Sequence, residues 1–168
     1  MDEIARLIEP QIPALRRYAY ALVRDHALAD DLVQDCLERA VARWILRRRD
    51  GELRAWLFAI LRNHHIDGLR QRRRHGVHIA LDETAPLTVA PAQDFNLAVR
   101  DVFAALDQLS EDQKSILLLI GVEDLSYEET ARVLCVPLGT VMSRLSRARQ
   151  KLRTIMETGP VTYLRSVK

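Results

Sequence analysis

The sequence predicts an all-α protein in which two small helical domains are joined by a flexible acidic linker. Alanine, leucine and arginine dominate the composition, and all three favour helix. No run of alternating β-branched residues indicates a strand. Two S-x-x-E/Q patterns, which cap helix N-termini through reciprocal hydrogen bonds, begin at Ser110 and Ser126. A chain of 168 residues is long enough to form two small domains.

The charge distribution supports this division. Residues 1–75 carry 15 Lys and Arg against 11 Asp and Glu, and residues 113–168 carry nine against five. Between them, residues 76–112 carry one basic residue against seven acidic ones. Two basic blocks with an acidic connector suit a protein that holds a polyanion at two places. Uneven surface charge without function is the alternative, and it is less favoured because each basic block contains an arginine-rich motif.

Helices are predicted in the first block over residues 12–24, 28–44 and 53–74. Pro10 and Pro13 mark the start of the first helix, because proline is tolerated in the first turn but not in the interior. The second helix has acids near its start, where they complement the helix macrodipole. In the third helix, Asp67 and Arg70 are spaced for an i, i+3 ion pair, and the helix ends in a run of arginines.

The middle of the chain separates the two blocks. Pro86 and Pro91 fall in a stretch without a helical stripe, which is predicted to be an extended linker. Helices resume at Phe95, and another begins at the capping box of Ser110. The predicted divisions are a first domain over 1–76, a linker over 77–94, a second domain over 95–157 and a tail over 158–168.

Residues 126–153 are the most informative segment, because they have the pattern of two helices joined by a tight turn. The first helix is predicted to reach Leu134, and the turn to span Cys135–Gly139 around Pro137. The second helix has an apolar stripe formed by Val141, Leu145, Ala148, Leu152 and Ile155. Its exposed flank carries Thr140, Arg144, Arg147 and Lys151. This pattern indicates a helix that enters a DNA major groove, although a surface helix with merely solvated arginines has the same pattern.

The order of these motifs resembles that of bacterial sigma factors, specifically the short extracytoplasmic-function (ECF) type with two domains. Residues 29–44, ADDLVQDCLERAVARW, look like the family's polymerase-binding helix. Residues 53–74, LRAWLFAILRNHHIDGLRQRRR, resemble the long helix that follows it. Residues 109–152 look like the fourth sigma region. The motifs keep the family's order, which implies a region 2 helical bundle followed by a region 4 helix-turn-helix.

The resemblance implies contacts with core RNA polymerase and with the melted minus-ten element. The predicted polymerase-binding residues are Asp31, Gln34, Asp35 and Glu38, which would face a basic coiled coil of the polymerase. The predicted minus-ten residues are Arg47, Arg48, Arg49, Arg62 and Asn63. Arginines suit the phosphates of a single strand, and an asparagine amide both donates and accepts hydrogen bonds. Trp56 is interpreted as part of the core rather than as a stacking platform.

The minus-thirty-five element is assigned to the second helix of the helix-turn-helix. Residues near the N-terminus of a recognition helix reach base edges, and later residues reach phosphates. The predicted base-reading residues are Thr140, Ser143, Arg144 and Arg147. Lys151, with Arg149 and Arg153, is predicted to contact the DNA backbone or solvent.

The chain departs from the family pattern at two places. Family members often carry an aromatic residue in the loop before the third helix, where this chain has Ile45 and Leu46 followed by arginines. Met142 stands where a basic residue is common. The mode of base clamping at the minus-ten element therefore stays open.

The predicted function is promoter recognition together with core RNA polymerase, with promoter DNA and an anti-sigma factor as further partners. In the free chain, the domains would be held together by the anti-sigma factor or by the acidic linker through Asp82, Glu83 and Asp94. A free-standing helix-turn-helix regulator is one alternative, but it leaves the second and third helices unexplained. A sigma mimic that titrates an anti-sigma protein is another.

Other classes are not indicated. No catalytic residue, metal site or cofactor is predicted, because adjacent residues such as His64 and His65 point in different directions on a helix. The N-terminus lacks a signal pattern, and no apolar run approaches the length of a membrane span, so a cytoplasmic protein without membrane insertion is expected. Cys36 and Cys135 are expected to be buried free thiols.

Overall fold

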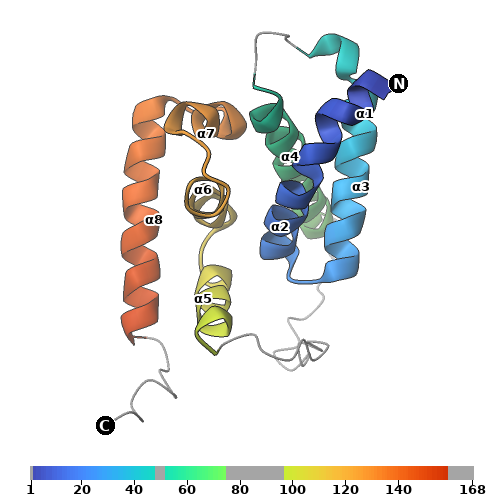
Figure 1. Ribbon diagram of the computed structural model, residues 1–168. Helices are drawn as coiled ribbons and strands as arrows, with labels where there is room; N and C mark the ends of the chain where they lie inside the picture. The colour runs from blue at the N-terminus through green and yellow to red at the C-terminus, as the bar shows by residue number, and fades with distance from the viewer. Residues whose placement is uncertain (1, 48–51, 75–96, 159–168) are drawn as a thin grey trace.

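The computed structural model describes residues 2–47, 52–74 and 97–158, and within these ranges the chain forms helices and no strand. Figure 1 shows two groups of helices packed side by side. The first group contains α1 (Asp2–Ile8), α2 (Ile12–Val23), α3 (His26–Ala42) and α4 (Leu53–Arg74). The second group contains α5 (Leu97–Asp107), α6 (Glu111–Gly121), α7 (Tyr127–Leu134) and α8 (Leu138–Thr158). The predicted all-α class is confirmed.

The first helix group follows the prediction closely, with differences at helix ends. The helix predicted over 53–74 has those bounds in α4. Helix α3 begins at His26, two residues earlier than predicted, because the side chain of Asp25 accepts a hydrogen bond from Leu28 N at 2.9 Å. It ends at Ala42, and Trp44–Leu46 form a 3-10 turn instead of continuing the helix. Helix α1 was not predicted.

In the second helix group, both capping boxes are present. Ser110 and Gln113 cap α6, and Ser126 and Glu129 cap α7 through reciprocal hydrogen bonds. The predicted turn was too long, because α8 begins at Leu138 and already contains Gly139.

The expectation of two buried thiols is wrong for one cysteine. Cys36 is buried, and burial raises the pKa of its thiol to about 12. Cys135 is exposed instead, since it ends α7 in the left-handed conformation, with φ of 53°, at the surface of the turn.

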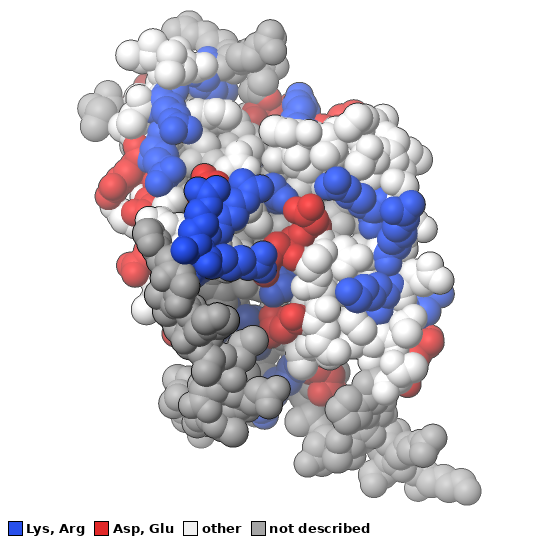
Figure 2. Space-filling model, turned by 180° about the vertical axis from the view of Figure 1, so that it is seen from behind, with Lys and Arg blue, Asp and Glu red and all other residues white. Residues whose placement is uncertain are grey.

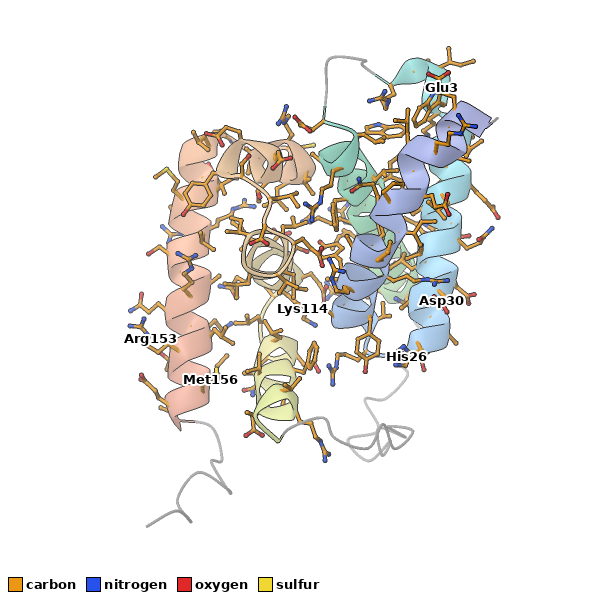
Figure 3. All side chains as sticks on the ribbon, viewed as in Figure 1. Glu3, His26, Asp30, Lys114, Arg153 and Met156 are labelled. Atoms are coloured by element: carbon orange, nitrogen blue, oxygen red, sulfur yellow. The ribbon has the colours of Figure 1, made fainter. Side chains whose placement is uncertain are left out.

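The two groups share a continuous hydrophobic core. In the first group, Tyr18 of α2 meets Phe58 of α4 edge to face, with ring centroids 5.2 Å apart. In the second group, the stripe of α8 buries Val141, Leu145 and Ala148, while Leu152 and Ile155 are half-buried. Each large side chain that is fully buried contributes about 1.5–3 kcal/mol relative to an exposed one. Figure 3 shows side chains of both groups filling the space between α6 and α2.

A second contact joins the end of α2 to α5. The guanidinium of Arg24 lies 3.7 Å from the ring centroid of Phe103, and Tyr20 approaches the same ring edge-on at 6.2 Å. The described parts of the two groups therefore touch directly. The predicted linker and its three acids, Asp82, Glu83 and Asp94, lie outside the described residues.

Candidate nucleic-acid interface

Helix α8 presents its predicted base-reading side to solvent. Burial of the apolar stripe fixes the rotation of the helix, so the opposite flank faces outward. Ser143, Arg147 and Lys151 are exposed, and Thr140 and Arg144 are partly exposed. The hydroxyl of Ser143 donates to the carbonyl oxygen of Thr140 at 3.1 Å, so its side chain is held against the helix backbone. Met142, at 53% exposure, adds an apolar contact beside them.

A second basic surface is a groove of about 500 Å³ between α3 and α4. Asn63, which was predicted, is exposed and lines it. Arg39, Arg43 and Arg70 line the groove as well, although they were not among the predicted site residues. The i, i+4 spacing of Arg39 and Arg43 on one helix was a signal that could have found two of them. Basic, amide and aromatic groups in one groove suit a single nucleic-acid strand.

Of the other predicted minus-ten residues that the structure describes, only Arg62 lines this groove. Arg47 lies with its guanidinium 4.8 Å from the ring centroid of Trp44. Arg48 and Arg49 lie outside the described residues. Arg62 lines the groove, but its side chain is only 11% exposed and pairs with Asp112 of α6. The ion pair predicted between Asp67 and Arg70 is present, with 3.6 Å between the charged atoms.

The packing of Trp56 supports the prediction that it is a core residue. It is half-buried, packs against the hydrophobic core and meets Trp44 edge to face with centroids 6.2 Å apart. It forms one wall of the groove at the same time.

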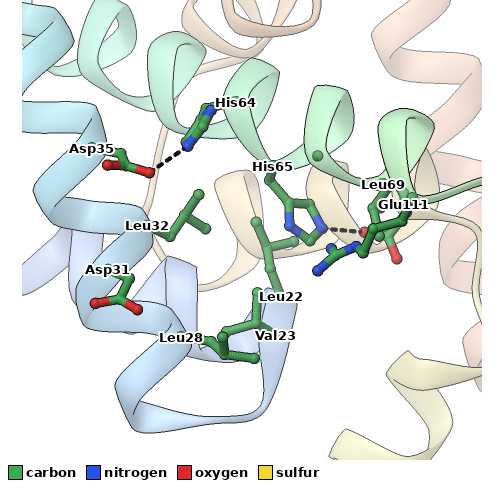
Figure 4. A pocket seen from close by; sticks show the side chains of 12 residues that line it. Leu22, Val23, Leu28, Asp31, Leu32, Asp35, His64, His65, Leu69 and Glu111 are labelled. Atoms are coloured by element: carbon green, nitrogen blue, oxygen red, sulfur yellow. Dashed lines mark hydrogen bonds and ion pairs between the residues drawn. The ribbon is translucent and has the colours of Figure 1, made fainter. Parts of the chain in front are cut away.

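The predicted polymerase-binding residues share the exposed side of α3. They are Asp31, Gln34, Asp35 and Glu38, and all four are exposed. Three of them are already held by a hydrogen-bond partner. Gln34 donates to Glu38 Oε1 at 3.0 Å, and Asp35 Oδ2 lies 2.7 Å from His64 Nε2 of α4 (Figure 4). His65, the next residue, points away from His64 toward α6, as expected for neighbours on a helix.

Charged residues of α6 and the loop after it contact the first helix group. His65 Nε2 lies 3.0 Å from Glu111 Oε2, and this hydrogen bond, with nearby Lys114, holds the pKa of the Glu111 carboxyl below its usual value. Glu123, at 1% exposure, accepts from Arg17 Nη2 at 2.9 Å and from Arg54 Nη2 at 3.4 Å. These contacts were not predicted, because no local pattern indicates which helices meet.

Burial at the same boundary also affects Tyr18. Its phenol is enclosed between the two groups, and burial raises its pKa to about 12. Figure 2 shows a face of the molecule on which Lys and Arg side chains gather in two parts, with acidic side chains between them. The basic surfaces of the two groups are therefore separated by acids at the boundary.

Neither a membrane span nor a metal cluster is found in the described parts of the chain. Every helix in these ranges is too short or too polar to cross a lipid bilayer. In the same ranges, His, Cys, Asp and Glu side chains form no group of three or more that could hold a metal ion.

Comparisons with known proteins agree with the motif order. The model described as "Sigma2 domain of PhyR" matches residues 8–62, and the model "Sigma-70, region 4" matches residues 100–152. The ECF RNA polymerase sigma factor EcfG of Rhodopseudomonas palustris is 36% identical, and the match covers 99% of this chain and 95% of that protein. The ECF RNA polymerase sigma factor SigE of Mycolicibacterium smegmatis is 35% identical over 88% of this chain and 59% of that protein.

Two solved structures have the same arrangement of helices. The sigma factor RpoE in complex with the anti-sigma factor NepR, from Bartonella quintana, is 34% identical, with a TM-score of 0.78 and coverage of 95% of this chain and 99% of that chain. CnrH, in complex with the cytosolic domain of CnrY, has a TM-score of 0.67 at 24% identity over 93% and 88% of the two chains, which is a likeness of fold. The chain therefore belongs to the ECF RNA polymerase sigma factors, the proteins that bind core RNA polymerase and direct it to promoters.

Proposed function

We propose that this sigma factor contacts a promoter at two places, with α8 in the major groove of the minus-thirty-five element and the α3–α4 groove on the melted minus-ten strand. The main support for the proposal is the set of side chains that line this groove. They are several arginines, the amide of Asn63 and the indole ring of Trp56. Phosphates, a base edge and a flat ring face are what a single strand offers to such groups. The exposed arginines of α8 supply the second contact.

The distance between the two promoter elements requires the helix groups to separate. About 25 base pairs span roughly 85 Å at 3.4 Å per base pair. A closed chain of 168 residues is only about 40 Å across. Extended at 3.3 Å per residue, the segment between Arg74 and Leu97 can reach about 75 Å. The side-by-side arrangement is therefore assigned to the free protein, and an open arrangement to the promoter complex.

Binding to core RNA polymerase is the proposed event that separates the two helix groups. Asp31, Gln34, Asp35 and Glu38 form an exposed acidic and amide surface on α3, which suits a basic helical partner. The polymerase performs the chemistry, so the sigma factor needs no catalytic residue of its own. The cytoplasm, where polymerase acts, is the proposed location.

An anti-sigma factor is the proposed regulator. The similar RpoE structure contains the anti-sigma factor NepR, and it matches this chain over almost its whole length. A partner that holds both helix groups together would keep the two promoter contacts from reaching their elements. Such a partner would act by favouring the closed arrangement.

A sigma mimic is the second candidate, because the matching model over residues 8–62 is described as the Sigma2 domain of PhyR. PhyR of Bartonella quintana, solved in complex with the anti-sigma factor NepR, is described as an anti-anti-sigma factor. A mimic needs the surface that binds an anti-sigma factor but not a DNA-reading helix. The exposed Arg147 and Lys151 on α8 favour a protein that reads promoters.

Run-off transcription separates the two candidates. Core RNA polymerase is incubated with genomic fragments, with and without the full chain. New start sites that depend on the chain, and a shared minus-thirty-five sequence upstream of them, are expected. Absence of initiation, together with tight binding to an anti-sigma factor, would support the mimic instead.

A further inference from the structure

Asp112 connects the two predicted DNA-binding surfaces. It lies in the first turn of α6 and lines the α3–α4 groove. Its Oδ1 accepts a hydrogen bond from Arg62 Nη2 of α4. Its Oδ2 lies 3.6 Å from Arg144 Nη1 of α8. One carboxylate thus faces an arginine predicted to bind the minus-ten strand and another predicted to read the minus-thirty-five element.

A carboxylate and a phosphate present similar pairs of anionic oxygens to a guanidinium group. The side chain of Arg62 is only 11% exposed, so a phosphate can reach it only after Asp112 has moved away. Arg144 is 40% exposed, and its pairing with Asp112 is a weaker obstacle. We propose that Asp112 is an internal competitor that occupies Arg62 and Arg144 in place of DNA phosphate in the free sigma factor. This inference rests on the proposed DNA contacts of these two arginines.

The position of Asp112 depends on the contacts that hold the groups together. The side chain of Glu123 is fully enclosed, and both of its arginine partners, Arg17 and Arg54, belong to the first helix group. Separation of the groups would expose this carboxylate and would carry Asp112 away from Arg62. Asp112 and Arg144 would stay together, because α6 and α8 belong to the same group and pack on each other.

The two pairs therefore have different requirements for release. Opening of the molecule frees Arg62 alone. Replacement of the carboxylate removes the competing charge from both arginines, whether the molecule is open or closed. This difference makes the competitor role separable from the docking of the two helix groups.

The test is DNA binding by the full chain without polymerase, measured by fluorescence anisotropy at low salt. The probes are a labelled 20-nucleotide single strand and a labelled duplex of the same sequence. Asp112→Asn is expected to tighten binding of both probes by about fivefold, the upper end of the effect of one partly exposed ion pair. Glu123→Gln is expected to tighten binding of the single strand. Adding Asp112→Asn to Glu123→Gln should then add little for the single strand, because Arg62 is already free.

Asp101→Asn is the matched control. Asp101 is an exposed residue of α5 for which the described residues provide no ion pair, and its replacement changes the net charge by the same amount. It should leave both affinities within twofold of the unchanged chain. Asp112→Glu keeps the charge and should stay close to the unchanged chain, and circular dichroism checks that each variant is folded.

Equal affinities for Asp112→Asn and Asp101→Asn with both probes would overturn the proposal. So would full additivity of Asp112→Asn and Glu123→Gln on the single strand, because it would place Arg62 outside the control of Asp112. Run-off transcription with the unchanged chain tests the proposed function separately. If that chain initiates and Asp112→Asn has no effect on DNA binding, only the competitor role fails.

Discussion

Helices α4 and α8 are the two long basic helices of the molecule, with 22 and 21 residues, and they meet their surroundings differently. Helix α8 buries three residues and leaves its basic flank in solvent. Helix α4 buries seven, including Arg62 and His65, because it packs on α3 on one side and on α7 on the other. The closed arrangement therefore exposes the proposed minus-thirty-five helix and covers part of the proposed minus-ten surface.

If both surfaces bind DNA as proposed, this difference allows the two DNA contacts to be controlled separately. The proposed contact on α8 depends on the local helix-turn-helix, which is complete within the second helix group. The proposed contact on α4 requires the two groups to be apart. Substitutions in each helix group and at their boundary can test this difference. The largest is expected to shift the equilibrium between the closed and open arrangements about a hundredfold, and the smallest to change only its dependence on pH.

The largest effect is expected from the double substitution of Arg17→Ala and Arg54→Ala. It leaves Glu123 enclosed without a partner, which destabilises the closed arrangement by about 3 kcal/mol, a roughly hundredfold change. Energy transfer between dyes on Cys135 and on a cysteine introduced by Glu9→Cys should fall as the groups separate. Arg16→Ala is the control, because Arg16 pairs with Asp30 at the surface, where both side chains are about 60% exposed. Equal energy transfer in both variants would contradict the role of Glu123.

Arg147→Ala and Lys151→Ala should distinguish base reading from backbone contact on α8. Loss of a bidentate arginine–guanine contact costs about 1–3 kcal/mol at one promoter position. Transcription by the holoenzyme from a set of minus-thirty-five variants should therefore lose discrimination with Arg147→Ala. Lys151→Ala should lower transcription from all the promoter variants by a similar factor. The same profile for both variants would show that Arg147 does not read bases.

Asn63→Ala tests the groove on α4. Loss of an amide that bonds to a base should cost about 1–2 kcal/mol, visible as weaker discrimination between minus-ten variants in the holoenzyme. Gln71→Ala, an exposed amide on the same helix outside the groove, is the control. If minus-ten preferences respond to Gln71→Ala as strongly as to Asn63→Ala, the groove is not the reading site.

The smallest effect concerns pH. The pKa of Glu111 is lowered from its ordinary value of 4.5, first by the hydrogen bond to His65 and further by Lys114 and Arg73. The ionised carboxylate therefore stabilises the closed arrangement fully above pH 4.5, and this contribution is lost as the pH falls through the lowered pKa. Energy transfer should differ between the unchanged chain and Glu111→Gln at neutral pH and converge only below the lowered pKa of Glu111. If the energy-transfer curves of the two chains stay parallel down to low pH, Glu111 does not stabilise the contact between the two helix groups.

Local patterns predicted most of the fold. The apolar stripe of α8 and the capping boxes at Ser110 and Ser126 depend on neighbours within a few turns, and the structure confirms them. Asn63 and Arg147 are exposed as their helix positions indicated.

Long-range pairings could not be predicted in this way. Arg62 was selected as a DNA contact because it is a basic residue of the long helix, yet its partner Asp112 lies 50 positions away in sequence. No role was predicted for Glu123, and its burial arises only where α2 and α4 meet the loop after α6. The charge of such residues can be read from the sequence, but the partner that neutralises them depends on tertiary packing.

The proposed function requires that the closed arrangement excludes promoter initiation. Arg54→Cys and Glu123→Cys, introduced together with Cys135→Ser, place one thiol on each helix group where the two groups touch. A short bismaleimide crosslinker with a reducible centre joins these thiols, and run-off transcription is then measured with core polymerase before and after reduction. The crosslinked chain should direct no initiation and should recover activity when the link is cleaved. Equal initiation by the crosslinked and the cleaved chain would show that the closed arrangement does not exclude initiation.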